Sequence, residues 1–211
     1  IQLNVNRVKQ DILRSRKVVG DGSVASDPTK VYNRILFISD LHAPYMHPDA
    51  LEFLKALAKK YGFDLIVCLG DELDYHAMSF HDSDPDLSSA GHELKQGRIF
   101  LHELEKIFPN MEIVESNHGS MKYRKAKHHG LPRHLLLSYR AAVFGEKGDD
   151  GDIYYPNDRG RGWTWHHDLI INTPREPVLV KHGGAKNTEK NIIDDRACFV
   201  QGHFHEDFNI V

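Results

Sequence analysis

The chain has 211 residues, of which 40% are hydrophobic and 27% are charged, a composition that suits one globular domain and excludes a disordered or fibrous chain. Its formal net charge of −3 provides no global basic field, so any contact with a polyanion must depend on local patches. No apolar stretch approaches the roughly 18 residues that a membrane span requires, and the first residues lack the apolar core of a secretory signal, so no membrane contact is predicted.

Residues 1–33 are predicted to form an N-terminal extension or linker. The first half is polar and only weakly helical, and the stretch GDGSVASDPTK is typical of a loop because Gly, Ser, Asp and Pro favour turns. The main domain is then expected over residues 34–211. The chain opens on Ile1 and stops at Val211 inside an apolar run, which leaves open a cut from a longer polypeptide at either end.

A strand, a helix and a second strand follow from residue 34. The runs RILFIS (34–39) and DLIVCLG (64–70) are continuous and apolar, as buried strands are, and the segment 49–62 between them has apolar residues at helical spacing. A second helix is predicted over 92–108, and the strand MEIVES (111–116) follows it. These elements predict a βαβ unit and an open α/β sheet.

The second half of the chain is mostly β-structure. Residues 132–144 are predicted to be helical, with Pro132 in the first turn, and the Gly- and Asp-rich stretch 145–161 is predicted to be a loop around one short strand. The further candidate strands are WTWHH (163–167), DLIINT (168–173), PVLVKH (177–182), ACFVQG (197–202) and DFNIV (207–211). Alternating strands and helices followed by consecutive strands suggest a mixed sheet, or two stacked sheets, with helices outside.

Five of the apolar runs end on side chains that bind metals. These side chains are Asp40, His42, Asp71, Asn117, His182, His203 and His205. Because an open α/β sheet builds its site at the carboxyl ends of its strands, we expect them to meet at one edge. Burying Asp40 and Asp71 unpaired would cost several kcal/mol, so the alternative without metal requires Arg or Lys partners that the sequence does not reveal.

Carboxylate oxygen, imidazole nitrogen and amide oxygen are the ligands of hard and borderline divalent ions. The predicted cofactor is therefore two divalent metal ions, with Mn²⁺ favoured and Fe, Zn²⁺ and Ni²⁺ as alternatives. Two metals roughly 3.5–4 Å apart need an anion between them to offset their repulsion. Asp71, flanked by Gly70 and Glu72, is the predicted bridging carboxylate.

Five motifs occur in order along the chain: DLH at 40–42, GDELD at 70–74, NH at 117–118, His182, and GHFH at 202–205. With these motifs the chain resembles the calcineurin-like metallophosphoesterases over most of its length. The resemblance implies an α/β fold, a four-layer αββα sandwich of two mixed β-sheets flanked by helices. It also implies that one metal is held by Asp40, His42, Asp71 and His205, and the other by Asp71, Asn117, His182 and His203.

The resemblance further implies catalytic roles for His118 and Asp74. His118 is expected not to bind metal but to protonate the leaving alkoxide, and Asp74 is expected to orient and support that imidazole. The family usually has Gly-Asn-His followed by an acidic residue, whereas this chain has Ser116-Asn117-His118-Gly119. This departure bears on how His118 is positioned and leaves the ligand set intact.

A basic run follows directly after this block. Lys122, Arg124 and Lys125 lie close to the site in sequence and are predicted to bind substrate by holding additional phosphates. The competing interpretation is that they are ordinary solvated charges on a loop. The sequence leaves both interpretations open.

These features predict a dinuclear-metal-dependent phosphoester hydrolase, in which a metal-bridging hydroxide attacks phosphorus and His118 is the general acid. The neighbouring basic run favours a phosphodiesterase or nuclease that acts on nucleotides or nucleic acid. The alternatives are a phosphomonoesterase acting on small phosphates or phosphoproteins, and a non-catalytic scaffold that keeps the fold.

The two cysteines indicate the compartment. Cys68 and Cys198 both lie within apolar runs, where a small buried thiol is far more common than a disulfide. We therefore expect a cytoplasmic protein. From the family resemblance, its expected partner is a phosphate-ester substrate. The sequence leaves the oligomeric state open.

Overall fold

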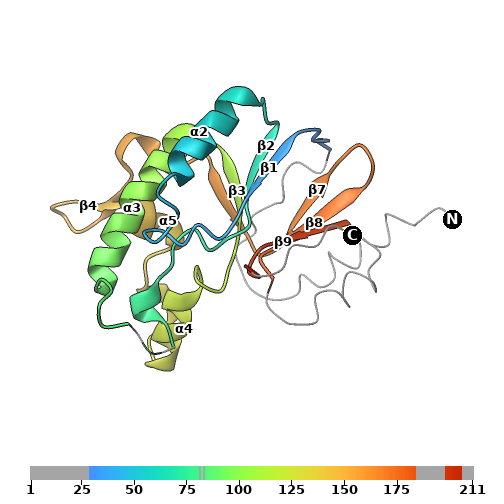
Figure 1. Ribbon diagram of the computed structural model, residues 1–211. Coiled ribbons are helices and arrows are strands. Elements are labelled where there is room, and N and C mark those ends of the chain that lie inside the picture. The colour runs from blue at the N-terminus through green and yellow to red at the C-terminus, as the bar shows by residue number, and fades with distance from the viewer. Residues whose placement is uncertain (1–28, 81, 83, 184–197, 206–211) are drawn as a thin grey trace.

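A four-stranded parallel sheet forms the centre of the computed structural model, which describes residues 29–80, 82, 84–183 and 198–205 (Figure 1). Its strands are β1 (Ile35–Ile38), β2 (Leu65–Cys68), β3 (Met111–Val114) and β6 (Trp163–His166), in that order. Each neighbouring pair is parallel, so the carboxyl ends of the four strands open at the same edge.

A second sheet contains three strands. These are β7 (Leu169–Asn172), β8 (Pro177–Lys181) and β9 (Cys198–Gln201), with β7 antiparallel to β8 and β8 parallel to β9. A separate hairpin of β4 (Glu146–Lys147) and β5 (Ile153–Tyr154) lies on the helical side of the molecule (Figure 1). The predicted strand DFNIV (207–211) lies outside the described residues.

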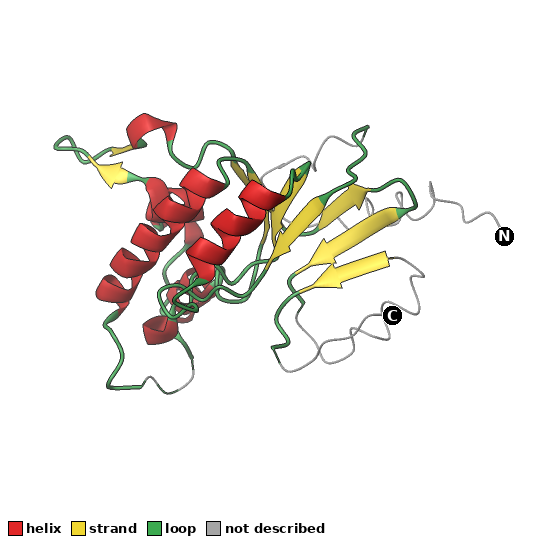
Figure 2. Ribbon diagram, turned by 45° about the horizontal axis from the view of Figure 1, so that its top comes forward, coloured by secondary structure: helices red, strands yellow, loops and turns green. Residues whose placement is uncertain are grey.

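The helices lie on one side of the parallel sheet, and the second sheet lies on the other (Figure 2). They are α2 (Ala50–Lys60), α3 (Ala90–Ile107), α4 (Met121–His128) and α5 (Tyr139–Phe144), with 3₁₀ turns η1 (His76–Met78), η2 (Arg133–Leu135) and η3 (Pro156–Asp158). The α2 and α3 bounds lie within two residues of the predicted ones. At the start of α3 the Ser89 hydroxyl accepts a hydrogen bond from the His92 amide, which satisfies one free N–H of the first turn.

Two hydrophobic cores lie on the two faces of the parallel sheet. Successive side chains of a strand point to opposite faces, so Cys68 and Ile113 pack beneath the helices, whereas Val67 and Val114 pack against the second sheet. All four side chains are almost completely inaccessible to water. Burial on both faces explains why these strands are continuous apolar runs in the sequence.

The described residues supply three of the four predicted layers, namely helices, a parallel sheet and a second sheet. The prediction of a mixed α/β fold with a parallel sheet and helices is confirmed. A helical layer over the outer face of the second sheet stays a prediction, because the described part of the chain places its helices on the other side.

Tyr32 belongs to the core between the sheets although it falls within the predicted extension 1–33. Its side chain is 5% exposed, and its backbone amide donates to the Asn172 carbonyl at 2.9 Å. Val31 also forms a bridge with Asn172. The packed domain therefore includes residues shortly before Arg34.

The predicted helix over 132–144 is wrong in its extent. Leu136 has an extended backbone between η2 and α5, and the Ser138 hydroxyl caps α5 by accepting from the Ala141 amide at 3.0 Å. Serine competes for backbone hydrogen bonds and so favours a helix start over a helix interior. The stretch 145–161 also contains two short strands where one was predicted.

Two smaller predictions need correction. The basic run after His118 is not a loop but the helix α4, whose Met121 and Ala126 are buried while its Lys and Arg residues are good helix formers. Both cysteines are free thiols, but only Cys68 is buried. Cys198 is exposed because it begins β9, the edge strand of the second sheet.

Candidate metal centre

The candidate site lies where five strands end. Asp40 and His42 follow β1, Asp71 follows β2, Asn117 follows β3, His182 follows β8, and His203 and His205 follow β9. All seven predicted ligands belong to the described part of the chain. The structure gathers six of them into two clusters, Asn117 lies beside the second, and a third group of His42, Asp71 and His118 connects the two clusters.

The first cluster contains Asp40, His42 and His205. The Nε2 atom of His205 lies 3.1 Å from Oδ1 of Asp40, and Nε2 of His42 lies 3.8 Å from the same oxygen. The backbone amide of His203 donates to both carboxylate oxygens of Asp40 at 3.1 Å. The Asp40 carboxylate therefore ties the end of β9 to the end of β1.

The second cluster contains Asp71, His182 and His203. The Nε2 atom of His182 lies 3.1 Å from Oδ2 of Asp71 and 2.7 Å from Oδ1 of Asn117. Its Nδ1 lies 2.9 Å from the carbonyl oxygen of Leu69, which can only accept a hydrogen bond, so Nδ1 is the donor. With Nδ1 donating to Leu69, Nε2 can face these two oxygen atoms either as the N–H of a protonated ring or, in a neutral ring, as a ligand of a cation bound between them.

Asp71 belongs to the second cluster and also reaches His42 of the first. Besides its contact with His182, its Oδ2 atom is 3.8 Å from Nε2 of His42 and 4.0 Å from Nε2 of His118. The side chain is only 2% exposed. A buried carboxylate that reaches ligands on both sides has the geometry that a bridging ligand requires.

Four of the candidate ligands have a left-handed backbone that L-residues rarely adopt. The angle φ is 52° at Asp40, 48° at His42, 52° at Asp71 and 78° at His203. Each such conformation costs on the order of 1–3 kcal/mol and persists only where the surrounding structure imposes it. The turns after the strands therefore direct carboxylates and imidazoles into the site, and their left-handed backbone conformations make the folded state less stable.

Two glycines allow backbone to approach these ligands. A Cβ atom on Gly202 would lie 2.1 Å from Oγ of Ser39 and 2.6 Å from Oδ2 of Asp40. A Cβ atom on Gly70, whose φ is 103°, would lie 2.5 Å from Cβ of Ser116. Both distances are far below van der Waals contact, so a larger side chain at either position would displace the site.

The carboxylates give the site a negative field. Burial by itself would raise the pKa of Asp71, but its hydrogen bond and charge interaction with His182 outweigh burial and lower it. Burial by itself would lower the pKa of His42, but the nearby carboxylates of Asp40 and Asp74 outweigh burial and raise it to about 10. The site therefore favours positive charge, which a divalent cation can supply.

The ring of His42 tests whether a metal suits these residues. Its Nδ1 atom lies 2.6 Å from Oδ1 of Asp74, whereas its buried Nε2 atom has no hydrogen-bond partner among the described residues. Metal-binding histidines typically donate one ring N–H to a carboxylate or carbonyl oxygen and keep the other nitrogen for the ion. His42 and His182 both follow this pattern, so the residues fit a pair of divalent cations.

His118 lies beside both clusters. Its Nδ1 atom hydrogen-bonds to the backbone carbonyl of Asp74, and its amide donates to Oδ1 of Asp71 at 3.1 Å. The His118 and His42 rings meet edge to face, with centroids 4.8 Å apart. The Asp74 carboxylate is 2.6 Å from Nδ1 of His42 but 3.8 Å from Nδ1 of His118. Asp74 thus holds His118 through its backbone and His42 through its side chain.

A family model described as calcineurin-like phosphoesterase matches residues 33–207, a range that includes every candidate ligand and His118. The chain belongs to the calcineurin-like phosphoesterase family. Membership supports metal-dependent phosphoester hydrolysis in general and a phosphate-ester substrate. No curated protein gives a match. Among the described helices, none has the length and apolar character needed to cross a membrane.

The departure from the usual family block involves two residues that contact each other. The Ser116 hydroxyl, at the place of the usual glycine, accepts a hydrogen bond from the Gly119 amide at 3.0 Å. A Cβ atom on Gly119 would lie 3.1 Å from that hydroxyl oxygen. A side chain at position 119 would therefore require the Ser116 hydroxyl to shift by a few tenths of an ångström, whereas glycine requires no shift.

The three predicted phosphate-binding cations lie on α4 of this calcineurin-like domain. Lys122 donates inward to the Leu137 carbonyl at 2.9 Å, and its burial together with Arg133 lowers its pKa to about 8. Lys125 donates to the Ser79 carbonyl at 3.0 Å. The exposed Arg124 donates to the Asn117 carbonyl at 2.8 Å, so it is the cation tied to a candidate metal ligand.

Two further residues contribute to this site and were not predicted from the sequence. Ser39 hydrogen-bonds to the Asp40 carboxylate, and the Leu69 carbonyl fixes the His182 ring. Ser39 could have been suspected from its place beside Asp40 at a strand end. The role of Leu69 has no signal in sequence, because it belongs to the backbone.

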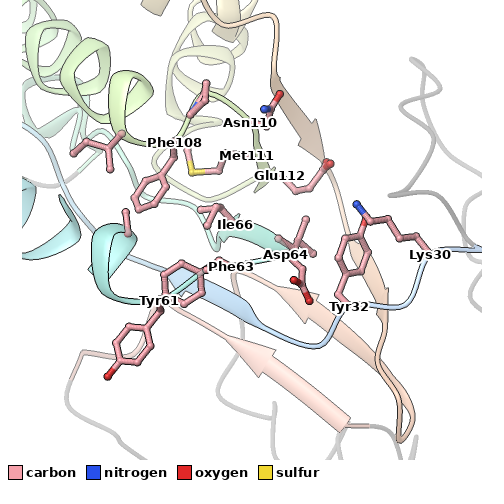
Figure 3. A pocket seen from close by; sticks show the side chains of 15 residues that line it. Lys30, Tyr32, Tyr61, Phe63, Asp64, Ile66, Phe108, Asn110, Met111 and Glu112 are labelled. Atoms are coloured by element: carbon pink, nitrogen blue, oxygen red, sulfur yellow. The ribbon is translucent and has the colours of Figure 1, made fainter. Parts of the chain in front are cut away.

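A cavity of about 450 Å³ lies at the opposite end of the sheet (Figure 3). Its walls include Leu65 and Met111, the first residues of β2 and β3, together with Tyr61, Phe63 and Phe108. The predicted ligands follow the other ends of these strands. This cavity is therefore separate from the candidate metal centre.

Proposed function

We propose that this chain is a dinuclear-metal-dependent phosphodiesterase that acts on nucleotides or nucleic acid. The observation that carries the proposal is the pair of ligand clusters that meet at Asp71, with His118 directly beside them. One cation would be held by Asp40, His42, Asp71 and His205, and the other by Asp71, Asn117, His182 and His203. Mn²⁺ is the proposed metal.

When bound, two divalent cations would supply Lewis acidity at the phosphoryl oxygens and a nucleophilic hydroxide from water at neutral pH. The chain's own residues supply the remaining steps. His118, with Nδ1 held by the Asp74 carbonyl, directs Nε2 at the site and donates a proton to the leaving alkoxide. Asp74 also holds His42 through its carboxylate and so fixes two imidazoles at once.

The preference for a diester rests on Arg124 and its neighbours on α4. A diester carries substituents on both sides of phosphorus, and a cation outside the ligand clusters can hold the phosphate that follows the scissile one. A phosphomonoesterase acting on small phosphates or phosphoproteins is the alternative enzyme. A scaffold without hydrolytic activity is the other alternative, and the retention of all seven ligands and His118 argues against it.

One set of assays tests the proposal. Hydrolysis of bis-(p-nitrophenyl) phosphate, p-nitrophenyl phosphate, single-stranded DNA and duplex DNA is measured with Mn²⁺ and after treatment with EDTA. The proposal expects metal-dependent turnover of the diesters that exceeds turnover of the monoester. A higher rate on the monoester would favour the phosphomonoesterase, and no turnover of any substrate would favour the scaffold.

A further inference from the structure

The surface next to His118 has an unusual distribution of charge. Residues 117–145 contain six Lys and Arg residues and no Asp or Glu, in a chain whose formal net charge is −3. Most of these cations lie on α4 and η2, at the end of the sheet that carries the metal ligands (Figure 1). We call the side chains of Phe80, Arg124 and Lys125 the α4 strip.

The cations of the α4 strip are not neutralised by carboxylates. Among the described residues, the Lys and Arg side chains that form ion pairs are Lys55, Lys106, Arg161 and Lys181. Arg124 and Lys125 instead contact backbone carbonyls and an aromatic ring. Their positive charge is therefore available to an anion from solution.

Arg124 links the strip to the candidate metal centre. One of its guanidinium N–H groups donates to the Asn117 carbonyl at 2.8 Å, while Oδ1 of Asn117 lies 2.7 Å from Nε2 of His182. Arginine has five N–H donors in a rigid plane, and the Arg124 side chain is exposed. Its remaining donors can hold a phosphate next to the one that occupies the metal centre.

Phe80 places an aromatic surface beside these charges. The Nζ atom of Lys125 lies 4.8 Å from the centre of the Phe80 ring, and Cζ of Arg124 lies 5.7 Å from it. Lys125 also donates to the Ser79 carbonyl and so fixes the backbone next to Phe80. Even so, Phe80 remains 48% exposed, which is a large fraction for a phenylalanine whose ring contacts Lys125, Arg124 and, edge to face, His128.

An exposed ring among unpaired cations suits a chain of alternating phosphates and unstacked bases. A duplex would present its phosphates to Arg124 but keeps its bases stacked inside, so it would leave Phe80 without a partner. We infer that the α4 strip binds single-stranded nucleic acid, with Arg124 on the phosphate next to the scissile one and Phe80 stacked on a base. This inference rests on the proposed function and narrows its substrate.

Binding to fluorescein-labelled dT12 tests the inference. Fluorescence anisotropy is measured with the full chain and Mn²⁺ at several salt concentrations, on dT12 whose phosphorothioate linkages resist hydrolysis. The variants are Arg124→Gln and Phe80→Ala, and the matched control is Lys127→Gln. Lys127 is exposed on the same helix, and its substitution removes the same charge one turn away.

We expect Arg124→Gln and Phe80→Ala each to weaken binding about tenfold, because one phosphate contact or one stacked base is lost. Arg124→Gln should also reduce the dependence of log affinity on log salt by about 0.7, whereas Phe80→Ala should leave it unchanged. Lys127→Gln should weaken binding less than about threefold, since it removes charge but no contact. Circular dichroism checks that each variant is folded.

Several results would overturn the inference. Equal losses in Arg124→Gln and Lys127→Gln, with no loss in Phe80→Ala, would indicate general charge attraction. Equal affinity for a 12-base-pair duplex would contradict the stacking role. Binding to phosphatidylglycerol vesicles but not to dT12 would assign the surface, with its exposed Leu131, Leu135 and Leu137, to membranes.

The same protein separates this inference from the proposed function. If the wild-type chain hydrolyses bis-(p-nitrophenyl) phosphate with Mn²⁺ but does not bind dT12, the α4 strip does not bind single-stranded nucleic acid. The proposed hydrolase activity would then still stand. If the wild-type chain binds dT12 and the variants lose affinity as expected, but no phosphate ester is hydrolysed, the proposed hydrolase activity is refuted. The inference that the α4 strip binds single-stranded nucleic acid would then still stand.

Discussion

The two ends of strand β2 each carry an aspartate, and the two aspartates have very different surroundings. Asp64, before the strand, is exposed and accepts hydrogen bonds from the amides of Asn33 and Arg34 at 2.8 and 3.0 Å. Asp71, after the strand, is 2% exposed, has a left-handed backbone and faces three imidazoles. At the amino end, the carboxylate of Asp64 thus accepts hydrogen bonds from backbone amides. At the carboxyl end, the buried carboxylate of Asp71 needs a positive partner, which a cation can provide.

The glycines at the two ends of the sheet differ in the same way. Gly62 at the amino end has its nearest side-chain atoms 3.8 Å from an added Cβ, whereas Gly202 at the carboxyl end would place Cβ 2.1 Å from Ser39. Apolar side chains such as Phe108 line the cavity at the amino end (Figure 3). We therefore expect substitutions at the amino end to change stability and substitutions at the carboxyl end to change metal binding and turnover.

The largest effect is expected for Asp71→Asn. Removing one negative charge between the two clusters should release metal and lower phosphodiester turnover by about 10³-fold, since the metal pair supplies several kcal/mol of charge stabilisation. Metal analysis of purified protein and assays with bis-(p-nitrophenyl) phosphate measure both effects. Asp64→Asn is the matched control and should retain both metals and wild-type turnover. Retention of two metals by Asp71→Asn would contradict its bridging role.

His118→Asn should have an effect that depends on the leaving group. For an alkyl ester the loss in kcat should be about 10²–10⁴-fold, because the departing alkoxide needs a proton. A nitrophenyl ester leaves as a stable anion and should lose much less. The measurement is kcat for both esters in Mn²⁺, with metal content as the control for site integrity. Equal losses on the two esters would show that His118 is not the general acid.

Phe108→Ala tests the amino end. Phe108 is 4% exposed and belongs to the core beneath the helices, so its truncation should reduce the free energy of unfolding by about 3 kcal/mol. Urea denaturation of metal-free protein measures this loss. The folded variant should keep its metal content and turnover. A loss of metal without a loss of stability would contradict the proposal that the amino end affects only stability.

The smallest effect is expected for Gly202→Ala. The added methyl group must displace the Ser39 hydroxyl and the Asp40 carboxylate, so the affinity of the first cluster for metal should fall about tenfold. Competition with a fluorescent chelator measures the affinity. Gly62→Ala, which has space for the methyl group, should change neither affinity nor stability noticeably. Wild-type affinity in Gly202→Ala would mean that the ligands tolerate movement.

The sequence placed the candidate ligands at one edge of the sheet because of how strands end. A continuous apolar run such as DLIVCLG marks a buried strand, and Asp71 directly after it can only reach the edge of the sheet. The order of the motifs also indicated the family, and the family match confirms it. The split of residues 132–144 was not predicted, because Leu136 and Ser138 interrupt the helix locally without disturbing its apolar pattern.

The sequence by itself determined which side chains could bind metal, because each follows a strand whose apolar pattern fixes its place at the sheet edge. Only the tertiary structure decided how they share the site. Asp74 reaches His42 with its carboxylate and His118 with its carbonyl, and Phe80 lies against Arg124 and Lys125. These contacts join segments that are distant in sequence, so their geometry follows from packing between strands and helices and has no signature in local residue spacing.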